Sequence, residues 1–245
     1  IAFLMIGCAK ENINTLDQIK KRGKLIAGVK YDTVLFGYKD PADSAVKGFD
    51  IDLMTSLAAH ILGDASRLEL KEVTSKTRIP LLLNRDIDII CATMTITEER
   101  KKQVLFSDVY YKAGQSLLVP RDSSIKDIKD LKGKKVLTAK GSTSALNIRK
   151  AAPDAAILEF ENYQEAFTAL KSKKGDALTT DNIILMGMVK QDPSFHLTGG
   201  LFTEEPYGMA IHPSQKEFQA LVNDWLKKIR SSGEYESIYS RWFAE

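Results

Sequence analysis

The sequence predicts an α/β protein made of two similar lobes, each with a mostly parallel sheet flanked by helices. Short apolar runs alternate with amphipathic helical patterns along most of the 245 residues, which is typical of α/β architecture. The same alternation begins again near Ser124, and no long linker separates the two sets. A chain of this length supports a sizeable core in one large domain or two smaller ones.

The first set of elements covers most of the first hundred residues. Strands are predicted over three apolar runs, residues 24–29, 68–73 and 87–92, because each is short and bounded by polar sequence. A helix is predicted over residues 50–62, where apolar residues recur every three or four positions until Gly63 ends the pattern. Pro80 opens a short helix, and the hydroxyl of Thr97 caps another. Cys91 lies within an apolar run and is interpreted as a buried core thiol.

The second set repeats this order. Strands are predicted over three further runs, residues 135–139, 156–160 and 177–180. Ser124 caps a short helix before the first of them, and the segment 141–144 leads into a longer helix after it. Asn162, with Glu165 three residues later, caps the next helix, and residues 181–189 form the last one of this set.

Two short, extended and apolar segments, residues 115–119 and 207–211, are the predicted connections between the lobes. The resulting boundaries are residues 13–115 plus 209–245 for the first lobe and residues 116–208 for the second. Two amphipathic helices over residues 215–243, broken at Ser231-Ser232-Gly233, have no strand partners of their own. We therefore expect them to pack on the first lobe.

The composition excludes several classes of protein. Hydrophobic residues make up 44% of the chain and charged residues 27%, which rules out a disordered chain, a collagen and a coiled coil. A net charge of only +3 gives no reason to expect a nucleic-acid partner. The histidines lie far apart, at His60, His196 and His212, and so do the cysteines, Cys8 and Cys91. Because no zinc spacing can be built from them, we expect neither a metal site nor a cofactor.

The first eight residues form an apolar run that ends in Gly7-Cys8 and is followed at once by polar sequence. This pattern looks like the tail of a secretory signal, and no segment of the chain approaches the ~20 apolar residues that span a bilayer. It resembles the lipobox of bacterial lipoproteins, although Met5 stands where leucine is usual, with Leu4 beside it. We interpret residues 1–12 as a signal remnant and anchor segment with a lipid on Cys8; a short buried strand with a free thiol is the alternative.

Enzyme motifs are mostly missing from the sequence. There is no nucleophile elbow, no P-loop and no dinucleotide fingerprint, and Ser123 with Lys126 matches S-x-x-K by chance in a polar capping segment. The informative polar residues instead stand at strand ends and helix starts, where α/β proteins bind ligands.

The segment after residue 92 is one such position. Thr93, Thr95 and Thr97 alternate and so face one way, and Arg100 lies one helical turn further on. Together they can hold a carboxylate, with the guanidinium supplying two parallel hydrogen bonds. The alternative is a capping motif with a solvated arginine, since arginine is usually exposed.

Similar positions occur in the second set. Ser142 and Thr143 stand between a strand and a helix, where free backbone N–H groups favour an anion; ordinary N-capping is the alternative. Asp181 ends a strand and can either cap the next helix or bind an ammonium group. Tyr163 opens a helix on the surface or in a pocket, and Arg78 is either a ligand-binding group or a solvated loop charge.

Five segments then occur in a recognisable order: residues 48–52 (GFDID), 73–82, 93–100, 106–111 and 205–210 (EPYGMA). Together they resemble the bacterial extracellular solute-binding proteins for polar amino acids, which feed ATP-driven importers. The resemblance covers about residues 13–243, and it is strongest to lipoprotein members named for glutamine or for glutamate and aspartate.

The resemblance implies a two-lobed fold of the type II periplasmic-binding-protein kind, in which two crossover strands join the lobes around a ligand cleft. Arg100 then matches the ligand of the amino acid's α-carboxylate, helped by Thr95 and the backbone near Thr93. Asp181 matches the acid that pairs with the α-ammonium. The other implied contacts are the hydroxyls of Ser142 or Thr143, the ring of Tyr163, the basic pair Arg78 and Lys30 at the ligand side chain, and the apolar walls Phe49 and Phe36.

The residues themselves agree with this interpretation, because a zwitterionic amino acid needs one cation and one anion, and Arg100 and Asp181 supply them from different lobes. The predicted function is a lipid-anchored, extracytoplasmic binding protein for glutamine or glutamate, with aspartate as a further candidate. It performs no chemistry, acts as a monomer, closes on the ligand and docks on a membrane permease.

Two alternatives remain. A dehydratase-like enzyme on the same scaffold requires a Glu or His in the pocket as general acid, whereas Glu98, Glu99 and Glu161 are interpreted as acids at helix starts. A ligand-sensing receptor domain is expected less, because the sequence as given carries no transmembrane or signalling segment before Glu245.

Overall fold

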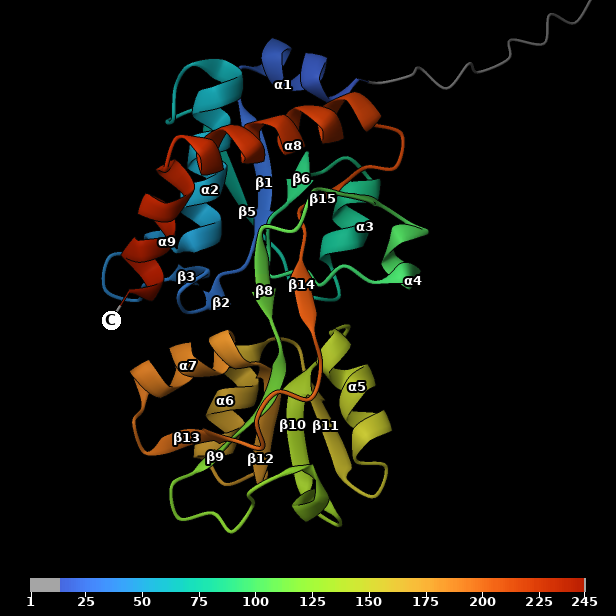
Figure 1. Cartoon of the computed structure of the whole chain (residues 1–245), viewed down its shortest axis with the longest axis vertical. Helices are drawn as coiled ribbons and strands as arrows, with labels where there is room; N and C mark the ends of the chain where they lie inside the picture. The colour runs from blue at the N-terminus through green and yellow to red at the C-terminus, as the bar shows by residue number, and fades with distance from the viewer. Residues whose placement is uncertain (1–13, 245) are drawn as a thin grey trace, which may run out of the picture.

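The computed structural model describes residues 14–244 and consists of two α/β lobes stacked along the long axis of the molecule (Figure 1). The predicted two-lobed fold is therefore confirmed. Residues 1–12, interpreted above as the anchor segment with Cys8, lie outside the described residues.

Lobe 1 is built on a sheet with the strand order β5-β1-β6-β15-β7. Its strands are β1 (Leu25–Val29), β5 (Leu68–Glu72), β6 (Ile89–Ile90), β7 (Leu105–Phe106) and β15 (Ala210–Ile211). β1 runs parallel to β5 and β6, whereas β15 runs antiparallel to β6 and β7. The helices of this lobe are α1 (Thr15–Arg22), α2 (Phe49–Leu62), α3 (Arg78–Leu83), α4 (Glu98–Lys101), α8 (Lys216–Ser231) and α9 (Glu234–Phe243). A small sheet beside them contains β2 (Asp32–Thr33), β3 (Gly37–Lys39) and β4 (Val46–Lys47).

Lobe 2 repeats the arrangement with the strand order β11-β10-β12-β9-β13. Its strands are β9 (Gln115–Pro120), β10 (Lys135–Ala139), β11 (Ala156–Phe160), β12 (Ala177–Asp181) and β13 (Phe195–Thr198). β10 is parallel to β11 and β12, and β9 is antiparallel to β12 and β13. The 3₁₀ helix η1 (Ile128–Leu131) and the helices α5 (Thr143–Ala151), α6 (Tyr163–Lys171) and α7 (Asn182–Gln191) complete this lobe.

The crossover strands are β8 (Tyr111–Ala113) and β14 (Glu205–Tyr207), which pair antiparallel between the lobes (Figure 1). The prediction that residues 115–119 and 207–211 make this connection is wrong, apart from Tyr207 itself. The apolar run of residues 115–119 is fully buried and forms most of β9 inside the lobe 2 sheet, and β15 belongs to the lobe 1 sheet. An apolar run indicates a buried segment. A strand inside a lobe is buried on both faces, whereas a thin connection between lobes leaves more of its surface exposed. The boundaries at 115/116 and 208/209 stay predictions.

The C-terminal helices pack on lobe 1, as predicted. α8 turns a stripe of buried side chains inward: Phe218, Val222, Trp225, Leu226 and Ile229. Gly233, with a φ of 81°, lets the chain turn sharply from α8 into α9. Asp52 of α2 then accepts hydrogen bonds from Arg241 Nη1 at 2.7 Å and Trp242 Nε1 at 2.8 Å, which fastens α9 to α2.

Several element ends differ from prediction. The helix η1 is capped by Asp127 in a reciprocal capping box with Asp130, and not by Ser124, because two acids three residues apart satisfy both orphan amides. The helix α3 begins at Arg78, two residues before Pro80, since proline is tolerated within a first helical turn. No helix of the described residues is long and apolar enough to cross a membrane.

Candidate functional site

The predicted site residues gather at the junction of the lobes, where the parallel strands of both sheets end. Each follows or ends such a strand: Lys30 after β1, Arg78 after β5, Thr93 and Thr95 after β6, Ser142 after β10, Tyr163 after β11 and Asp181 at the end of β12. All of them are buried. The sheet topology therefore brings together charged side chains from both lobes in the interior of the molecule.

Arg100 reaches from lobe 1 to lobe 2. Thr97 accepts a hydrogen bond from its backbone N–H and thereby caps α4. The Arg100 guanidinium donates to the Thr95 carbonyl at 2.7 Å and to the Gly141 carbonyl of lobe 2 at 3.4 Å. Burial lowers the pKa of Arg100, and no carboxylate of the described residues forms an ion pair with it. The solvated-arginine alternative is therefore wrong.

Arg78 is the second buried cation. Its Nη1 donates to the Ala92 carbonyl at 2.6 Å, whereas its buried Nε has no hydrogen-bond partner among residues 14–244. Burial, followed by the nearby positive charge of Arg100, lowers the pKa of Arg78 to about 9. A buried guanidinium without a carboxylate is costly, so this position favours an acceptor supplied from outside the chain.

Lys30 is fully buried and lies between the lobes. Its Nζ donates to Ser75 Oγ at 3.2 Å, lies 4.0 Å from Asp32 Oδ1 and sits 5.3 Å from the centre of the Tyr163 ring. Burial lowers the pKa of Lys30 to about 8, although Asp32 opposes the shift. The ammonium group thus has one hydrogen bond, one cation–π contact and one ion pair at the long distance of 4.0 Å.

Asp181 supplies the negative charge at the junction. Its Oδ2 accepts a hydrogen bond from the Tyr207 hydroxyl, but its buried Oδ1 has no partner in the described part of the chain. The side chain makes no capping hydrogen bond to α7, so the capping alternative is wrong. Burial, and then the negative charge of Glu205, raises the pKa of Asp181 to about 7. A cationic ligand group at Oδ1 would relieve both effects.

The hydroxyls of Ser142 and Thr143 are engaged within the protein. Ser142 caps α5 by accepting from the Ala145 N–H at 3.2 Å and donates to the Ala139 carbonyl at 2.6 Å. Thr143 donates to Glu205 Oε2 on the crossover strand β14 at 3.0 Å. Ser142 therefore acts as an N-cap here, and its contact with a ligand stays a prediction.

Tyr163 lies in the interior and not on the surface. Its backbone N–H donates to Asp32 Oδ2 in lobe 1 at 2.9 Å, and its hydroxyl lies 3.4 Å from Ser144 Oγ. The hydrogen bond from Tyr163 to Asp32 is a second direct contact between the lobes, after that of Arg100 with Gly141. A third is at Gly141, where a Cβ would stand 2.9 Å from the backbone of Lys76. The lobes are thus in direct contact over the site.

The alternation of the threonines is interrupted. Thr93 has a φ of 45°, in the left-handed region, so Thr93 and Thr95 do not simply face one way. Thr95 bridges to Tyr207 of β14. Phe36 and Phe49 lie in an aromatic cluster with Tyr110, Tyr111, Tyr207, Tyr235, Tyr239 and Phe243. Their part as ligand walls stays a prediction.

Several residues of the site were not predicted. Ser75 and Asp32 surround Lys30, whereas Glu205 accepts from Thr143, Asn147 and Thr203 in the second lobe. The segment of residues 205–210 was recognised, but a buried glutamate beside proline has no local pattern that indicates its partners. Its role follows from the pairing of β14 with β8.

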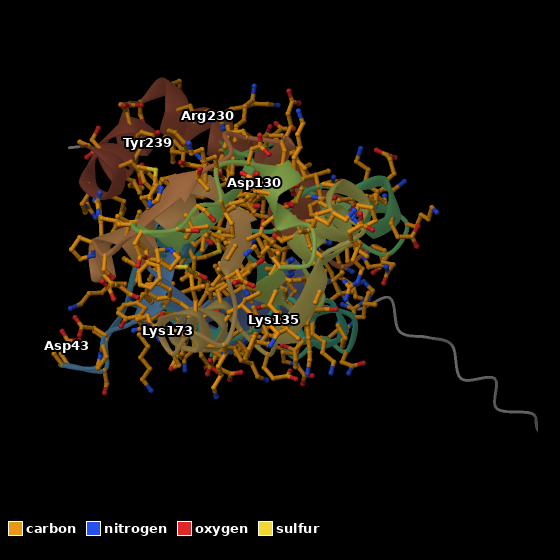
Figure 2. All side chains as sticks on the ribbon, turned by 90° about the horizontal axis from the view of Figure 1, so that it is seen from below. Asp43, Asp130, Lys135, Lys173, Arg230 and Tyr239 are labelled. Carbon is orange, nitrogen blue, oxygen red and sulfur yellow. The ribbon has the colours of Figure 1, made fainter. Side chains whose placement is uncertain are left out.

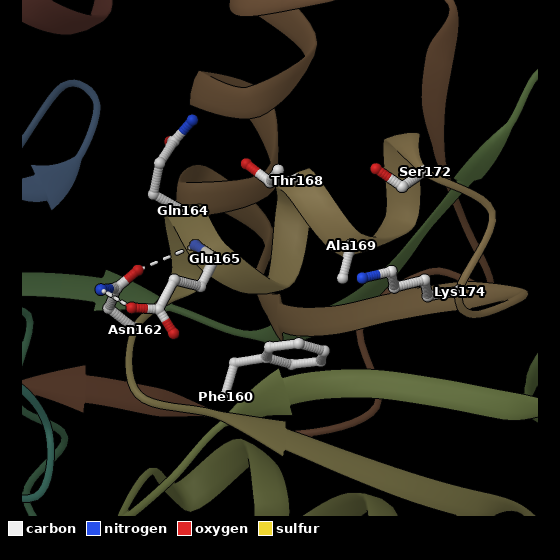
Figure 3. A pocket seen from close by; sticks show the side chains of 8 residues that line it. All are labelled: Phe160, Asn162, Gln164, Glu165, Thr168, Ala169, Ser172 and Lys174. Carbon is white, nitrogen blue, oxygen red and sulfur yellow. Dashed lines mark hydrogen bonds between the residues drawn. The ribbon is translucent and has the colours of Figure 1, made fainter.

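A further hollow lies on the surface of lobe 2. The groove along α6 in Figure 3 is formed by Phe160, Asn162, Gln164, Glu165, Thr168, Ala169, Ser172 and Lys174. Two of its polar side chains form the predicted helix cap, in which Asn162 accepts from the Glu165 N–H at 2.8 Å and donates to the Glu165 carboxylate at 3.0 Å. Figure 2 views the molecule from below, and the labelled Asp130, Lys135 and Lys173 are exposed side chains of lobe 2. No group of three or more potential metal ligands occurs among the described residues.

Two α/β lobes that meet over buried, incompletely paired charges define a binding protein for a small charged solute. The chain belongs to the bacterial extracellular solute-binding proteins, family 3, which it matches over residues 25–245.

Relatives and solved structures agree with this family. The chain is 57% identical to the ABC transporter glutamine-binding protein GlnH of Bacillus subtilis, over 95% of this chain and 85% of that protein. It is 64% identical to a glutamine-binding protein of Geobacillus stearothermophilus, over 86% of this chain and 81% of that protein. The structure of an ancestral arginine-binding protein bound to glutamine superposes with a TM-score of 0.85 at 41% identity, covering 91% of this chain and 99% of the other.

Proposed function

We propose that this protein is the solute-binding component of an ABC importer and that it closes its two lobes around L-glutamine. The observation that carries the proposal is a pair of buried polar atoms at the junction, Arg78 Nε and Asp181 Oδ1, neither of which has a hydrogen-bond partner among residues 14–244. One is a donor on a cation and the other an acceptor on an acid, as the binding of a zwitterion with a polar side chain requires. The relatives named for glutamine support the choice of ligand.

Arg100 is the proposed partner of the α-carboxylate, with Thr95 and the backbone near Thr93 as further contacts. Its bond to the Gly141 carbonyl is long at 3.4 Å, so a carboxylate can replace it with a charged acceptor. Asp181 is the proposed partner of the α-ammonium through its free Oδ1. Because the two groups lie on different lobes, bound ligand favours the closed arrangement.

Arg78 and Lys30 are the proposed partners of the ligand side chain, with Tyr163 covering Lys30. Ser142, Thr143 and Phe49 remain candidate wall residues. Arg78 favours glutamate as the second candidate, because the side-chain carboxylate of glutamate would pair with a guanidinium that has no carboxylate partner among residues 14–244.

Calorimetric titration of the purified protein with glutamine, glutamate and aspartate tests this function. We expect saturable binding of glutamine at one site, with glutamate weaker. Binding of none of the three would reject the proposal. Binding of a cationic amino acid alone would reject the assigned roles of Lys30 and Arg78.

An enzymatic role has less support. The relatives at 57% and 64% identity are named as binding proteins, and nothing in their names indicates a receptor or a dehydratase. The acids considered as general acids lie at the surface, where Glu98, Glu99 and Glu161 pair with Lys101, Lys102 and Lys140.

We also propose that the protein acts as a monomer outside the cytoplasm, anchored through a lipid on Cys8, and delivers ligand to a membrane permease. The support is the apolar run that ends in Gly7-Cys8. Two or more acyl chains give stable anchoring. In the native host, the variant Cys8→Ser should leave the membrane fraction, and an unmodified Cys8 in the mass spectrum of the membrane-bound protein would contradict the anchor.

A further inference from the structure

The segment Gly48-Phe49-Asp50-Ile51-Asp52 contains two acids whose roles are not explained by ligand binding as proposed above. Both lie in the first turn of α2. Asp52 faces α9 and accepts from Arg241 and Trp242. Asp50 is fully buried and faces the opposite direction, toward the turn that follows β6.

The Asp50 carboxyl group is held by hydrogen bonds from Thr93 and Tyr110, and the buried Cys91 thiol is a further hydrogen-bonding neighbour. Asp50 Oδ2 accepts from the Thr93 backbone N–H at 3.1 Å, and its Oδ1 accepts from the Tyr110 hydroxyl at 2.9 Å. Its position in the first turn of a helix also favours a negative charge. Gly48 makes this position possible: its φ is 147°, and a Cβ there would stand 2.0 Å from the Phe36 carbonyl oxygen.

The peptide group between Ala92 and Thr93 is held from both sides. Its carbonyl accepts from Arg78 Nη1 at 2.6 Å, and its N–H donates to Asp50. Thr93 has a φ of 45°, a conformation that costs a β-branched residue energy and persists only when its surroundings enforce it. The hydrogen bonds to Asp50 and from Arg78 supply that enforcement.

We propose that Asp50 is a positioning residue that holds Thr93 in its left-handed conformation, so that the turn presents its backbone to the ligand carboxylate. This inference rests on the proposed function, because the turn matters only if ligand binds beside it. Asp50 itself does not touch the ligand. It acts through its hydrogen bond with the backbone N–H of Thr93. This bond stabilises the left-handed conformation against the extended backbone that threonine prefers.

The variants Asp50→Ala, Asp50→Asn and Asp52→Ala separate positioning from general stability. Asparagine can still accept from the Thr93 N–H and donate to the Tyr110 hydroxyl, so it keeps the geometry without the charge. Asp52→Ala is the matched control, since it removes an acid two residues away that holds α9 instead. We expect Asp50→Ala to weaken glutamine binding about tenfold or more, because the buried Thr93 N–H loses its acceptor, with Asp50→Asn intermediate and Asp52→Ala unchanged.

A double-mutant cycle with Thr93→Gly tests the mechanism directly. Glycine adopts a positive φ without cost, so the penalty of Asp50→Ala on affinity should shrink by roughly threefold or more when it is combined with Thr93→Gly. An additive cycle would overturn the proposal. So would an Asp50→Ala affinity equal to that of Asp52→Ala.

Hydrogen exchange at the Thr93 amide provides a readout that needs no ligand. We expect faster exchange in Asp50→Ala and native protection in Asp52→Ala, and unchanged protection in Asp50→Ala would overturn the proposal. If Asp50→Ala does not fold, the same cycle and exchange comparison are made with Asp50→Asn. If the wild-type protein binds no glutamine, the proposed function fails, and the exchange measurement alone decides the role of Asp50.

Discussion

Arg100 of lobe 1 donates a hydrogen bond across the lobe junction to the Gly141 carbonyl of lobe 2, at 3.4 Å. The contact joins a helix start in one lobe to the loop before a helix in the other. It is long for a charged hydrogen bond, and Arg100 has no carboxylate partner among residues 14–244. A ligand carboxylate at this position would therefore replace a weak interlobe contact with a strong one.

The first prediction concerns Arg100 itself. Arg100→Ala should abolish glutamine binding, with a loss of about 3 kcal/mol or more, because the buried α-carboxylate loses its charged partner. Calorimetry checks this, and Lys101→Ala is the control because Lys101 is the next residue of α4 and forms an exposed pair with Glu98. Retained binding in Arg100→Ala would remove this residue from the site.

The second prediction separates the two ends of the ligand. Arg78→Met should weaken glutamate more than glutamine, because a neutral amide loses an ordinary hydrogen bond of about 1 kcal/mol while a carboxylate loses an ion pair. The variant also lacks the hydrogen bond from Arg78 to the Ala92 carbonyl, which affects the binding of both ligands. The ratio of the two affinities is therefore the informative quantity. Equal losses for both would mean that Arg78 does not contact the side chain.

The third prediction tests lobe closure at Gly141. Gly141 and Gly133 both have a φ of 70°, so Gly→Ala at either position should cost about 1 kcal/mol of unfolding free energy. Only at Gly141 would the new Cβ meet the other lobe, 2.9 Å from the Lys76 backbone; at Gly133 nothing lies within 4 Å. We expect Gly141→Ala, but not Gly133→Ala, to weaken glutamine binding and to enlarge the radius of gyration in small-angle scattering. Equal affinities would show that the lobes bind ligand without this close approach.

The fourth prediction concerns pH. Burial raises the pKa of Asp181 to about 7 from its ordinary value of 3.8. Between about pH 4 and pH 7 the folded protein keeps a proton that the unfolded chain releases, so the unfolding free energy falls as pH rises. Asp181→Asn should reduce the fall between pH 5 and pH 8 by roughly 2 to 3 kcal/mol. Urea unfolding of the ligand-free protein at pH 5 and pH 8 measures it. Asp50, whose pKa burial also raises to about 7, leaves a remaining fall of the same sign.

Glutamine binding should show the opposite trend with pH. An α-ammonium group pairs with the ionised form of Asp181, so affinity should rise about tenfold per pH unit below pH 7 and level off above it. Titrations in buffers of different ionisation enthalpy should detect one proton released on binding. A flat affinity between pH 5.5 and pH 7.5 would mean that the ammonium group does not meet Asp181.

Local sequence patterns were sufficient where a feature depends on neighbouring residues. Asn162 and Glu165 form the predicted cap of α6, and Gly63 ends α2 in the left-handed conformation. The buried stripe of α8 also follows the predicted periodicity. These interactions span a few residues, so their chemistry is present in the order of the chain.

Patterns failed where a second nearby residue took the expected role, or where the deciding contacts come from a distant segment. Ser124 has the chemistry of a helix cap, yet Asp127 caps η1 because Asp130 completes the reciprocal pair. The apolar run of β9 suggested a connection, yet its burial between β12 and β13 places it inside lobe 2. The positive φ of Thr93 has no signal in a run of alternating threonines, because the contacts that hold it come from Asp50 and Arg78.

The order of residues alone was enough to predict the α/β class, the two lobes, the family and the identity of the charged residues at the strand ends. Hydrophobic periodicity and strand-end chemistry are local properties, so they can be recognised in a linear chain. Which of these charges are left incompletely paired depends instead on the folded arrangement. Arg100 meets Gly141 and Asp181 meets Tyr207 across 41 and 26 residues of chain, and such contacts depend on how the two sheets face each other. Whether a buried charge is satisfied depends on every group around it in space, which a linear pattern does not contain.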